Sequence, residues 1–218
     1  MLPATIFIRT YRPDDRDVVR MIACDTADRG EPVESFFRDR ETFADLLTRY
    51  YTDWEPQSLW VAEVEGRVIG YLTGCLNTHR YWTVMQRRII PRAVWGAVCR
   101  GALRSYQTWR VLRAGVQTLA VGRMRREASS VAHPAHLHLN VAKAFRSQRV
   151  GRQLLERFLA QARAAGSPGV HAAVREDNDA GKRFFERMGF TVLGRYPVVR
   201  PDAAGGHSGE TIVYGTSW

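Results

Sequence analysis

The sequence predicts an α/β protein in which helices flank a mixed central sheet. Three observations support this class. Apolar and polar residues alternate with strand-like period near both ends of the chain, amphipathic helical patterns lie between those runs, and strands and helices follow in regular order after Pro134. The 218 residues, of which 45% are hydrophobic, can bury a full core, so a single domain over residues 1–218 is expected.

The first part of the chain predicts one strand, two helices and a hairpin, in that order. The strand covers residues 4–11, and a helix follows over residues 13–30, opened by a proline and closed by Gly30. The hairpin covers residues 58–76 with a tight turn at Glu65-Gly66. The second helix covers residues 34–51, and its expected buried side chains are Phe36, Phe43, Leu46, Leu47 and Tyr50.

Residues 78–134 predict a basic, mainly helical insertion between the third and fourth strands. From Gly66 to Arg126 the chain carries twelve arginines and neither Asp nor Glu, although the net charge of the whole chain is only +10. Apolar or small residues recur there at heptad-like spacing, and we expect them to form a packed stripe: Trp95, Val98, Ala102, Ser105, Trp109, Leu112, Val116 and Leu119. Glycines within the segment allow either one helix or two shorter ones. Two roles stay open for this segment: it packs on its own domain, or it contacts a membrane surface.

The part after Pro134 predicts alternating strands and helices. The expected strands are residues 135–141, 169–174, 190–196 and 209–218, and the expected helices are residues 151–166 and 177–189. Between the first of these strands and the first of these helices lies the loop AKAFRSQR, residues 142–149. Backbone N–H groups at a helix start attract phosphate, and Gly151 allows a ligand to approach the backbone closely. The nearby Arg146, Arg149 and Arg152 add positive charge, which suits a pyrophosphate.

The spacing V-x-x-x-x-R-x-x-R-V-G-R-x-L-L resembles the coenzyme A-binding motif of the GNAT N-acetyltransferase superfamily, Arg/Gln-x-x-Gly-x-Gly/Ala. Arg146 matches its first position and Gly151 its last, whereas Arg149 replaces the middle glycine. If that position requires a positive φ, arginine costs about 1 kcal/mol there. The block NDAGKRFFERMGF, residues 178–190, resembles the family's Asn-x-x-Ala-x-x-Phe-Tyr-Glu-x-x-Gly-Phe helix.

This resemblance implies a GNAT-like fold and acetyl-CoA as co-substrate. It also implies direct transfer of the acetyl group to an amine, with backbone N–H groups of Leu139 to Val141 stabilising the oxyanion. The residues expected to bind acetyl-CoA are Leu139, Asn140, Val141, Arg146, Ser147, Gln148, Arg149, Val150, Gly151, Arg152, Asn178 and Phe185.

Phe185 stands where the family usually has the tyrosine that protonates the leaving thiolate. Phenylalanine has no proton to give, so water, Tyr196 or Tyr214 is the alternative acid. The same departure leaves a second hypothesis open. The chain is then a catalytically inactive GNAT-fold module that binds coenzyme A, or an anionic or protein partner.

Three histidines are the candidate general bases, with His138 first, followed by His136 and His171; Glu176 and Asp177 are further candidates. The strand AHLHLNV resembles the His-x-His strand of arylalkylamine N-acetyltransferases. The spacing between these histidines and Arg146 is one residue shorter than in that family. A shift of one residue moves a strand side chain to the other face of the sheet, so a bulge would be needed to restore the family's orientation. AHLHLNV and PGVHAAV are also similar to the acetyltransferase-like domain of bacterial O-GlcNAc hydrolases.

The remaining expectations concern partners and location. Cys24, Cys75 and Cys99 lie far apart, which predicts neither a metal site nor a disulfide framework. No run of 18 apolar residues occurs, and the cytoplasm is the expected location. The acceptor is a small-molecule or protein amine, and the basic insertion favours one that is anionic or lipid-linked. Among the hypotheses for function, nucleic-acid binding through the insertion's aromatic residues ranks last. A homodimer is compatible with the sequence.

Overall fold

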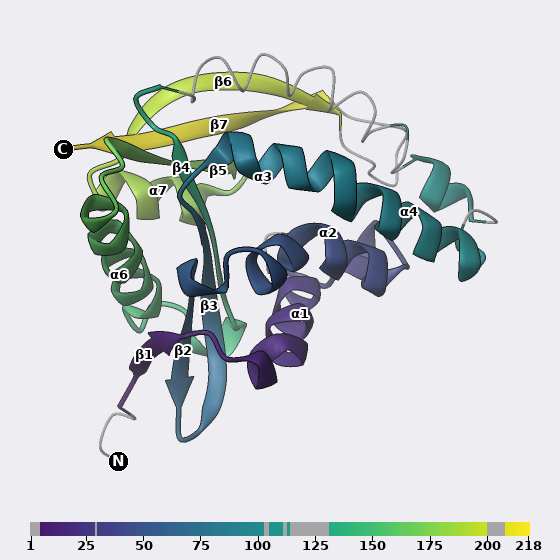
Figure 1. The fold of residues 1–218 in the computed structure, drawn as a ribbon, viewed down its shortest axis with the longest axis horizontal. Helices are drawn as coiled ribbons and strands as arrows, with labels where there is room; N and C mark the ends of the chain where they lie inside the picture. Colours follow the sequence, from purple (N-terminus) through teal and green to yellow (C-terminus); the bar gives the residue numbers. More distant parts are fainter. Residues whose placement is uncertain (1–4, 29, 103–104, 111–112, 114–130, 200–207) are drawn as a thin grey trace.

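The computed structural model describes residues 5–28, 30–102, 105–110, 113, 131–199 and 208–218. All its strands join one seven-stranded sheet in the order β1-β2-β3-β4-β5-β7-β6 (Figure 1). The strands are β1 Phe7–Thr10, β2 Leu59–Val64, β3 Arg67–Cys75, β4 Ala135–Val141, β5 Gly169–Arg175, β6 Thr191–Val199 and β7 Ser208–Ser217. Neighbouring strands are antiparallel except β4 and β5, which are parallel. The predicted mixed sheet is therefore confirmed.

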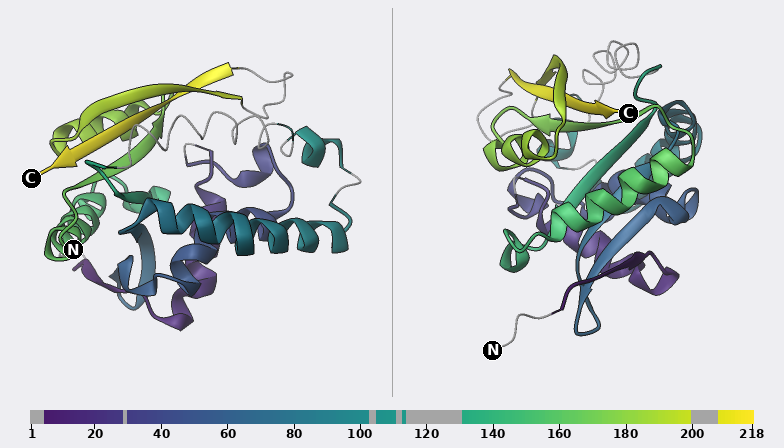
Figure 2. Two further views of the ribbon diagram at one scale, coloured as in Figure 1. Left: turned by 45° about the horizontal axis from the view of Figure 1, so that its top comes forward. Right: turned by 90° about the vertical axis from the view of Figure 1, so that its left-hand side faces the viewer.

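Helices cover both faces of this sheet (Figures 1 and 2). On one face lie α6 Val150–Ala164 and α7 Asp179–Arg187, which pack on a core built around Leu137, Leu154 and Phe158. On the other lie α1 Arg16–Asp25, α2 Arg40–Asp53, α3 Thr78–Val84 and α4 Ile90–Cys99. Their core contains Tyr51, Tyr71 and Ile89. Because side chains alternate along a strand, residues 135, 137, 139 and 141 of β4 face α6, and residues 136, 138 and 140 face the α1–α3 side.

The predicted tight turn between β2 and β3 is confirmed. Glu65 and Gly66 have φ angles of 49° and 77°. Two successive residues in the left-handed region define the type I′ turn, whose twist matches that of an antiparallel hairpin.

The two N-terminal helices are shorter than the sequence predicts. The first ends at Asp25 rather than at Gly30. The second begins at Arg40 because the Asp39 carboxylate accepts a hydrogen bond from the Thr42 backbone N–H at 3.1 Å and caps the helix there. Of the predicted stripe, Tyr50 is buried, and Phe43 and Leu46 are partly buried and pack against hydrophobic clusters. Phe36 also packs against a cluster but precedes the helix, and Leu47 is half-buried. The fully buried side chains of the helix are Thr42, Ala44, Thr48, Tyr50, Tyr51 and Thr52.

An ion-pair network ties β1 to the start of α1. Arg9 donates to both carboxylate oxygens of Asp15, at 2.6 and 2.8 Å, and its Nε donates to Glu63 of β2 at 2.8 Å. The Arg12 backbone N–H adds a third hydrogen bond to Asp15 at 2.7 Å. Burial opposes ionisation of Asp15, but these donors outweigh it and hold the pKa of Asp15 below its ordinary value.

We expect Asp15→Asn to lower the free energy of unfolding by about 3 kcal/mol, because it leaves Arg9 without its main partner. Since the folded-state pKa of Asp15 is lowered, its stabilisation is complete above the unfolded-state pKa of about 4 and is lost as the pH falls below that value. Urea denaturation at neutral and acidic pH measures both effects. The exposed Asp17→Asn is the control, and an equal loss in both variants would contradict the prediction.

The chain between β3 and β4 forms a long rod made of α3, a π-helical turn over Met85–Ile89, and α4 (Figures 1 and 2). Pro91 lacks an N–H group, and its ring clashes with the preceding α-helical turn. The wider π turn directly before it accommodates the proline without ending the rod. The rod ends at Cys99, before Gly101 with a φ of 71°, and residues 106–110 are again helical. The helical character of the described part of the insertion, and its place between the third and fourth strands, agree with the prediction.

The predicted packing face of the insertion was wrong. The buried face consists of Met85, Ile89, Ala93 and Ala97, while Trp95 is 69% exposed and Val98 40% exposed. The alanines are the physical reason, because small side chains let α4 lie close to α2. Trp109 is also exposed, at 57%. Leu112, Val116, Leu119 and several of the insertion's arginines lie outside the described residues. No helix in the described part of the chain is long and apolar enough to span a membrane.

Candidate active site between β4 and β5

The parallel strands β4 and β5 separate after a short contact. Their pairing covers only Ala135↔Val170, His136↔His171 and Leu137↔Ala172. Beyond Leu137, β4 continues to Val141 beside β3 on its other edge. The sheet therefore opens between β4 and β5 on the side where both strands end.

The backbone of Leu139 and Val141 is directed toward this opening. The Ala142 N–H bonds to the Ile69 carbonyl on the β3 side at 2.9 Å. In an antiparallel pair the hydrogen bonds to one neighbour come from every second residue. It follows that Asn140 and His138 bond to β3, whereas the N–H and C=O groups of Leu139 and Val141 face away from it. An extended ligand can pair with these groups as an additional strand.

The loop after β4 turns sharply into α6. Ser147 and Arg149 have φ angles of 66° and 63°, and Arg149 is the N-cap residue of α6. Arginine thus occupies a left-handed position at the site where the motif has glycine. The N–H of Gln153 bonds to the Arg149 carbonyl at 3.1 Å as the first bond of the helix. The N–H groups of residues 150–152 precede it and point beyond the helix end, which attracts anions.

Gly151 lies directly beside the opening. A Cβ atom placed there would meet the Leu139 side chain at 3.0 Å and the Phe184 ring at 3.4 Å. Leu139 belongs to β4 and Phe184 to α7, so glycine leaves space at the junction of β4, α6 and α7. The missing side chain lets these elements pack closely and leaves the backbone of α6 accessible to close approach.

The side chains of the loop have defined positions. Arg146 is exposed; its Nε donates to the Val141 carbonyl at 3.2 Å, and its guanidinium lies against Gly30, where no Cβ would fit. Arg152 forms an exposed ion pair with Glu156 at 2.7 Å. Gln148 donates to the Ala144 carbonyl at 3.3 Å. Arg146 and Arg152 thus have partners within the protein, and their role in binding a pyrophosphate, like that of Arg149, stays a prediction.

We expect Arg149→Gly to raise the free energy of unfolding by up to about 1 kcal/mol, because glycine adopts a positive φ without steric strain. A gain of this size raises the Tm by about 2–4 °C for a chain of this length. The control is Arg152→Gly in the first turn of α6, which should destabilise by about 1 kcal/mol because its backbone is already helical. Thermal unfolding measures both, and destabilisation by Arg149→Gly would contradict the prediction.

The two expected acetyl-CoA contacts on α7 have structural partners. The Asn178 Oδ1 accepts a hydrogen bond from the Gly181 N–H at 3.0 Å and caps α7. Phe185 is only 7% exposed. Its ring centroid lies 5.1 Å from that of Phe190 and 6.1 Å from that of Tyr214, on which it stacks. Phe184, rather than Phe185, is the aromatic residue beside Gly151. Whether either residue binds a ligand stays a prediction.

The three candidate histidines come together on the α1–α3 side of the sheet. The rings of His136 and His138 lie 5.8 Å apart, and those of His136 and His171 lie 5.6 Å apart. His138 is the first residue of β4 beyond the last pair with β5. The β3–β4 register runs without a bulge, so the one-residue difference in spacing between the histidines and Arg146 is not compensated within this strand pair. His136 and His138 share one face because they are two residues apart in a strand.

The hydrogen bonds of His136 define its tautomer. The Thr78 hydroxyl donates its proton to the Pro134 carbonyl at 2.7 Å, because that carbonyl can only accept. Thr78 Oγ1, at 2.8 Å from His136 Nδ1, must therefore accept from it. The Nε2 atom of the neutral ring then accepts from the Tyr51 hydroxyl at 2.9 Å. Burial raises the pKa of Tyr51 well above its ordinary value, so Tyr51 stays a donor. Both ring nitrogens of His136 therefore have partners within the protein, and its role as a base stays a prediction.

His171 has a defined tautomer as well. Its Nδ1 lies 2.8 Å from the His133 carbonyl, which can only accept, so Nδ1 carries the proton. The Nε2 atom of the neutral ring is consequently its basic nitrogen.

The other candidates lie apart from this cluster or have partners. Asp177 pairs with Arg175 at 2.9 Å, and the Glu176 backbone N–H bonds to the Glu210 carbonyl at 3.0 Å. The Tyr214 hydroxyl donates to Glu186 at 2.9 Å on the α7 side of the sheet. Tyr196 lies over Gly194 on the edge strand β6. Among the described residues, no group of three or more His, Cys, Asp or Glu side chains is arranged as a metal site.

The comparison with known proteins identifies the class that this fold and site define. A family model described as "Acetyltransferase (GNAT) family" matches residues 27–190. The match covers most of the chain, and the protein belongs to the GNAT family of acetyltransferases.

Solved structures share the fold. SsHAT is 23% identical with a TM-score of 0.73, over 99% of this chain and 98% of that one. The yncA protein of Salmonella typhimurium, solved with acetyl-CoA, is 18% identical with a TM-score of 0.59. The match covers 97% of this chain and 93% of that one. Naa20 of Chaetomium thermophilum, solved with a bisubstrate analogue, is 21% identical with a TM-score of 0.56. The match covers 97% of this chain and 86% of that one.

Sequence reasoning missed the residues that surround the histidines. Tyr51 of α2, and Thr78 and Tyr81 of α3, approach His136 from elements far away in the chain. It also missed the connection between α1 and α2. There Thr26 accepts from the Asn140 side chain at 2.6 Å, and Asp28 pairs with Arg175 at 2.7 Å. No spacing signal marks any of these residues, because each contact depends on the register of β3, β4 and β5.

Proposed function

We propose that the protein is an acetyl-CoA-dependent N-acetyltransferase that transfers the acetyl group directly to the amine of an acceptor. The observation that carries this proposal is the opening between β4 and β5, which has different chemistry on its two sides. The α6–α7 side offers the anion-attracting helix start and the space at Gly151. The α1–α3 side offers the histidine cluster.

Acetyl-CoA fits the first of these sides. The N–H groups of residues 150–152, with Arg146 and Arg149 nearby, suit its pyrophosphate. The pantetheine arm is narrow and carries amides, so it suits both the space at Gly151 and the strand edge of Leu139 and Val141. Acetyl-CoA is bound in a structure of the Salmonella relative, which supports the same co-substrate here.

The reaction needs a base, an oxyanion site and a leaving group. His138, at the point where the strands separate, removes a proton from the acceptor's ammonium group, and the resulting amine attacks the thioester carbonyl. The N–H of Leu139 or Val141 donates to the oxyanion of the tetrahedral intermediate. Collapse of the intermediate expels the thiolate of coenzyme A, and the extra proton on the attacking nitrogen passes through water to this thiolate, so that the neutral amide and free coenzyme A result. A thiolate is a stable leaving group, so the reaction proceeds although Phe185 cannot donate a proton.

A second candidate function rests on Phe185 and on Arg149, the two departures from the family's motifs. The Phe185 ring is buried in the core, and no acidic group takes its place at that position. In that case the protein binds coenzyme A, or an anionic or protein partner, without turnover.

One experiment separates these functions. The purified chain is titrated with acetyl-CoA by calorimetry, and thiol release is then followed with a panel of small amines and peptides that differ in charge. Binding with acceptor-dependent thiol release is the expected result. Binding without release for any amine would favour the inactive module, and absence of binding would contradict both. The panel also tests whether the acceptor is anionic or lipid-linked, as the basic insertion favours.

A further inference from the structure

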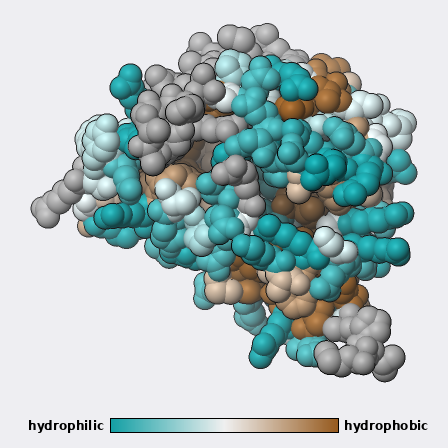
Figure 3. All heavy atoms as spheres, turned by 180° about the vertical axis from the view of Figure 1, so that it is seen from behind, coloured by the Kyte–Doolittle hydropathy of each residue, from teal (hydrophilic) through white to brown (hydrophobic). Residues whose placement is uncertain are grey.

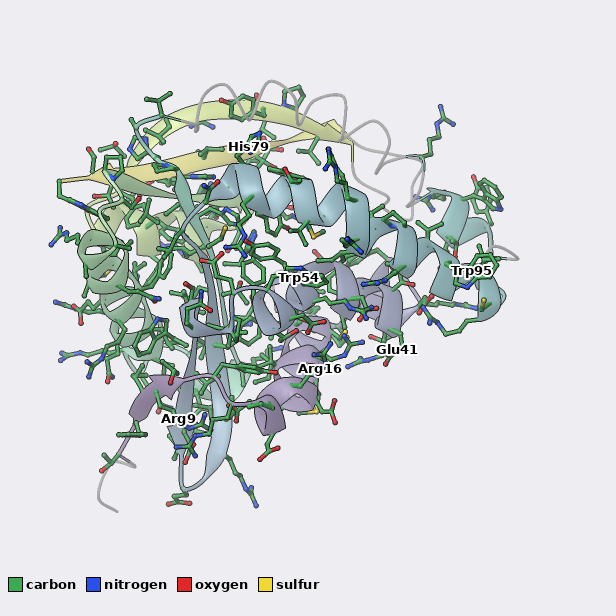
Figure 4. The ribbon with its side chains drawn as sticks, viewed as in Figure 1. Arg9, Arg16, Glu41, Trp54, His79 and Trp95 are labelled. Carbon is green, nitrogen blue, oxygen red and sulfur yellow. The ribbon has the colours of Figure 1, made fainter. Side chains whose placement is uncertain are left out.

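The outward face of the α3–α4 rod combines exposed apolar and basic side chains. A helix turns by about 100° per residue. This places Trp95 opposite the buried Ala93 and Ala97, with Val98 on one side of it and Arg92 on the other. Trp95 is 69% exposed, and Val94 and Val98 are each 40% exposed. Trp95 lies on α4 at the end of the molecule opposite α6 (Figure 4). We call Arg87, Arg88, Arg92, Val94, Trp95 and Val98 the rod face.

The basic residues of this face keep their charge available. Arg87, Arg88 and Arg92 are exposed and form no ion pair within the part of the chain that the structure describes. Arg100, further along the chain, pairs with Asp39 at 3.0 Å instead. The surrounding sequence contributes no acid, since neither Asp nor Glu occurs from Gly66 to Arg126. The rod face therefore has a single sign of charge, complementary to an anionic surface.

The apolar half of the face has the composition of an interfacial helix. Exposed tryptophan is amphipathic, and it is enriched where apolar and aqueous phases meet. The helix itself is not long and apolar enough to cross a bilayer. A helix with one buried side and an exposed side of Trp, Val and Arg can lie in the plane of a membrane surface. Seen from behind, the molecule is mainly hydrophilic, with apolar atoms in separate areas (Figure 3).

We propose that the rod face docks the protein on an anionic lipid surface. Arg87, Arg88 and Arg92 contact the headgroups, while Trp95 and Val98 enter the boundary between headgroups and acyl chains. Electrostatic attraction of this kind contributes about a fivefold gain in binding for each arginine near the surface. The inference is independent of acetyl transfer, because the face lies on the rod and not at the opening between β4 and β5.

The experiment measures sedimentation of the full chain with phosphatidylcholine vesicles that contain or lack phosphatidylglycerol. We expect binding only to the anionic vesicles, with loss at high salt. The variant Arg88→Glu/Arg92→Glu should bind at least about 25-fold more weakly. The control Arg67→Glu/Arg157→Glu makes the same change of net charge at exposed positions on β3 and α6 and should bind like the wild type. Trp95→Ser should weaken binding and abolish a lipid-dependent blue shift of the tryptophan fluorescence.

Three results would overturn the proposal. Equal losses in the two double variants would mean that only net charge matters. Binding of mixed-sequence oligonucleotides without binding of vesicles would assign the face to nucleic acid. A dimer that dissociates on Trp95→Ser, in a protein that does not bind vesicles, would assign it to a second copy of the chain. Acetyl-CoA affinity, measured in the same variants, should not change.

Discussion

Replacing His138 by alanine is expected to lower turnover by about 10²–10⁴-fold while leaving the affinity for acetyl-CoA unchanged. His138 follows the last residue of β4 that pairs with β5, and it immediately precedes Leu139, whose backbone faces the opening. It lies on the α1–α3 side of the sheet, away from the helix start of α6. Loss of the imidazole therefore removes the base without changing the coenzyme site.

The pH dependence of kcat/KM gives a second readout. A base acts in its neutral form, so the wild-type kcat/KM should fall as the pH is lowered and the base becomes protonated. The residual activity of His138→Ala should instead follow the fraction of the acceptor amine that is already deprotonated in solution, so its pH profile should shift to higher pH. Steady-state kinetics from pH 5 to 9 with an active amine, together with calorimetry of acetyl-CoA binding, measure both effects.

Two variants serve as controls for this prediction. His171→Gln keeps a donor for the His133 carbonyl and should lower turnover less than about tenfold. His79→Ala removes an exposed imidazole on α3 and should have no effect. Full turnover of His138→Ala would exclude it as the base. If His171→Gln alone caused the large loss, the role would belong to His171.

Replacing Gly151 by leucine is expected to weaken acetyl-CoA binding by more than about 100-fold. A Cβ at this position already meets Leu139 at 3.0 Å and Phe184 at 3.4 Å, so leucine displaces these side chains and, in the binding mode proposed above, occupies the place of the pantetheine arm. Acetyl-CoA would then lose the contacts of the strand edge, and a loss of about 3 kcal/mol corresponds to more than a 100-fold change in Kd.

The control for Gly151→Leu must separate blocked binding from misfolding. Gly151→Ala adds only one carbon atom, so it should reduce the affinity for acetyl-CoA less than Gly151→Leu does. Arg157→Leu introduces the same leucine on the exposed side of α6 and should leave the affinity unchanged. Calorimetry gives the Kd and thermal unfolding checks the fold. Wild-type affinity in a folded Gly151→Leu variant would mean that acetyl-CoA does not pass this residue.

The regular elements of the C-terminal half could be predicted from the sequence because their signals are local. Residues 135–141 alternate and form β4, and the αL strain at Arg149 follows from its place in a glycine position. The basic character of the insertion is likewise a property of composition. Sequence alone therefore predicted the sheet type, the loop with an arginine in a left-handed position before α6, and the placement of the histidines on β4 and β5.

Tertiary structure decided what these elements face. A helix pattern with apolar residues on two sides does not show which side is buried, and close approach of α4 to α2 selected Ala93 and Ala97 over Trp95. The register of β4 against β3 and β5 determined that Leu139 and Val141 face the opening, and it brought Tyr51 and Thr78 to the ring of His136. These are contacts between residues distant in the chain, and their energies depend on packing that no local pattern contains.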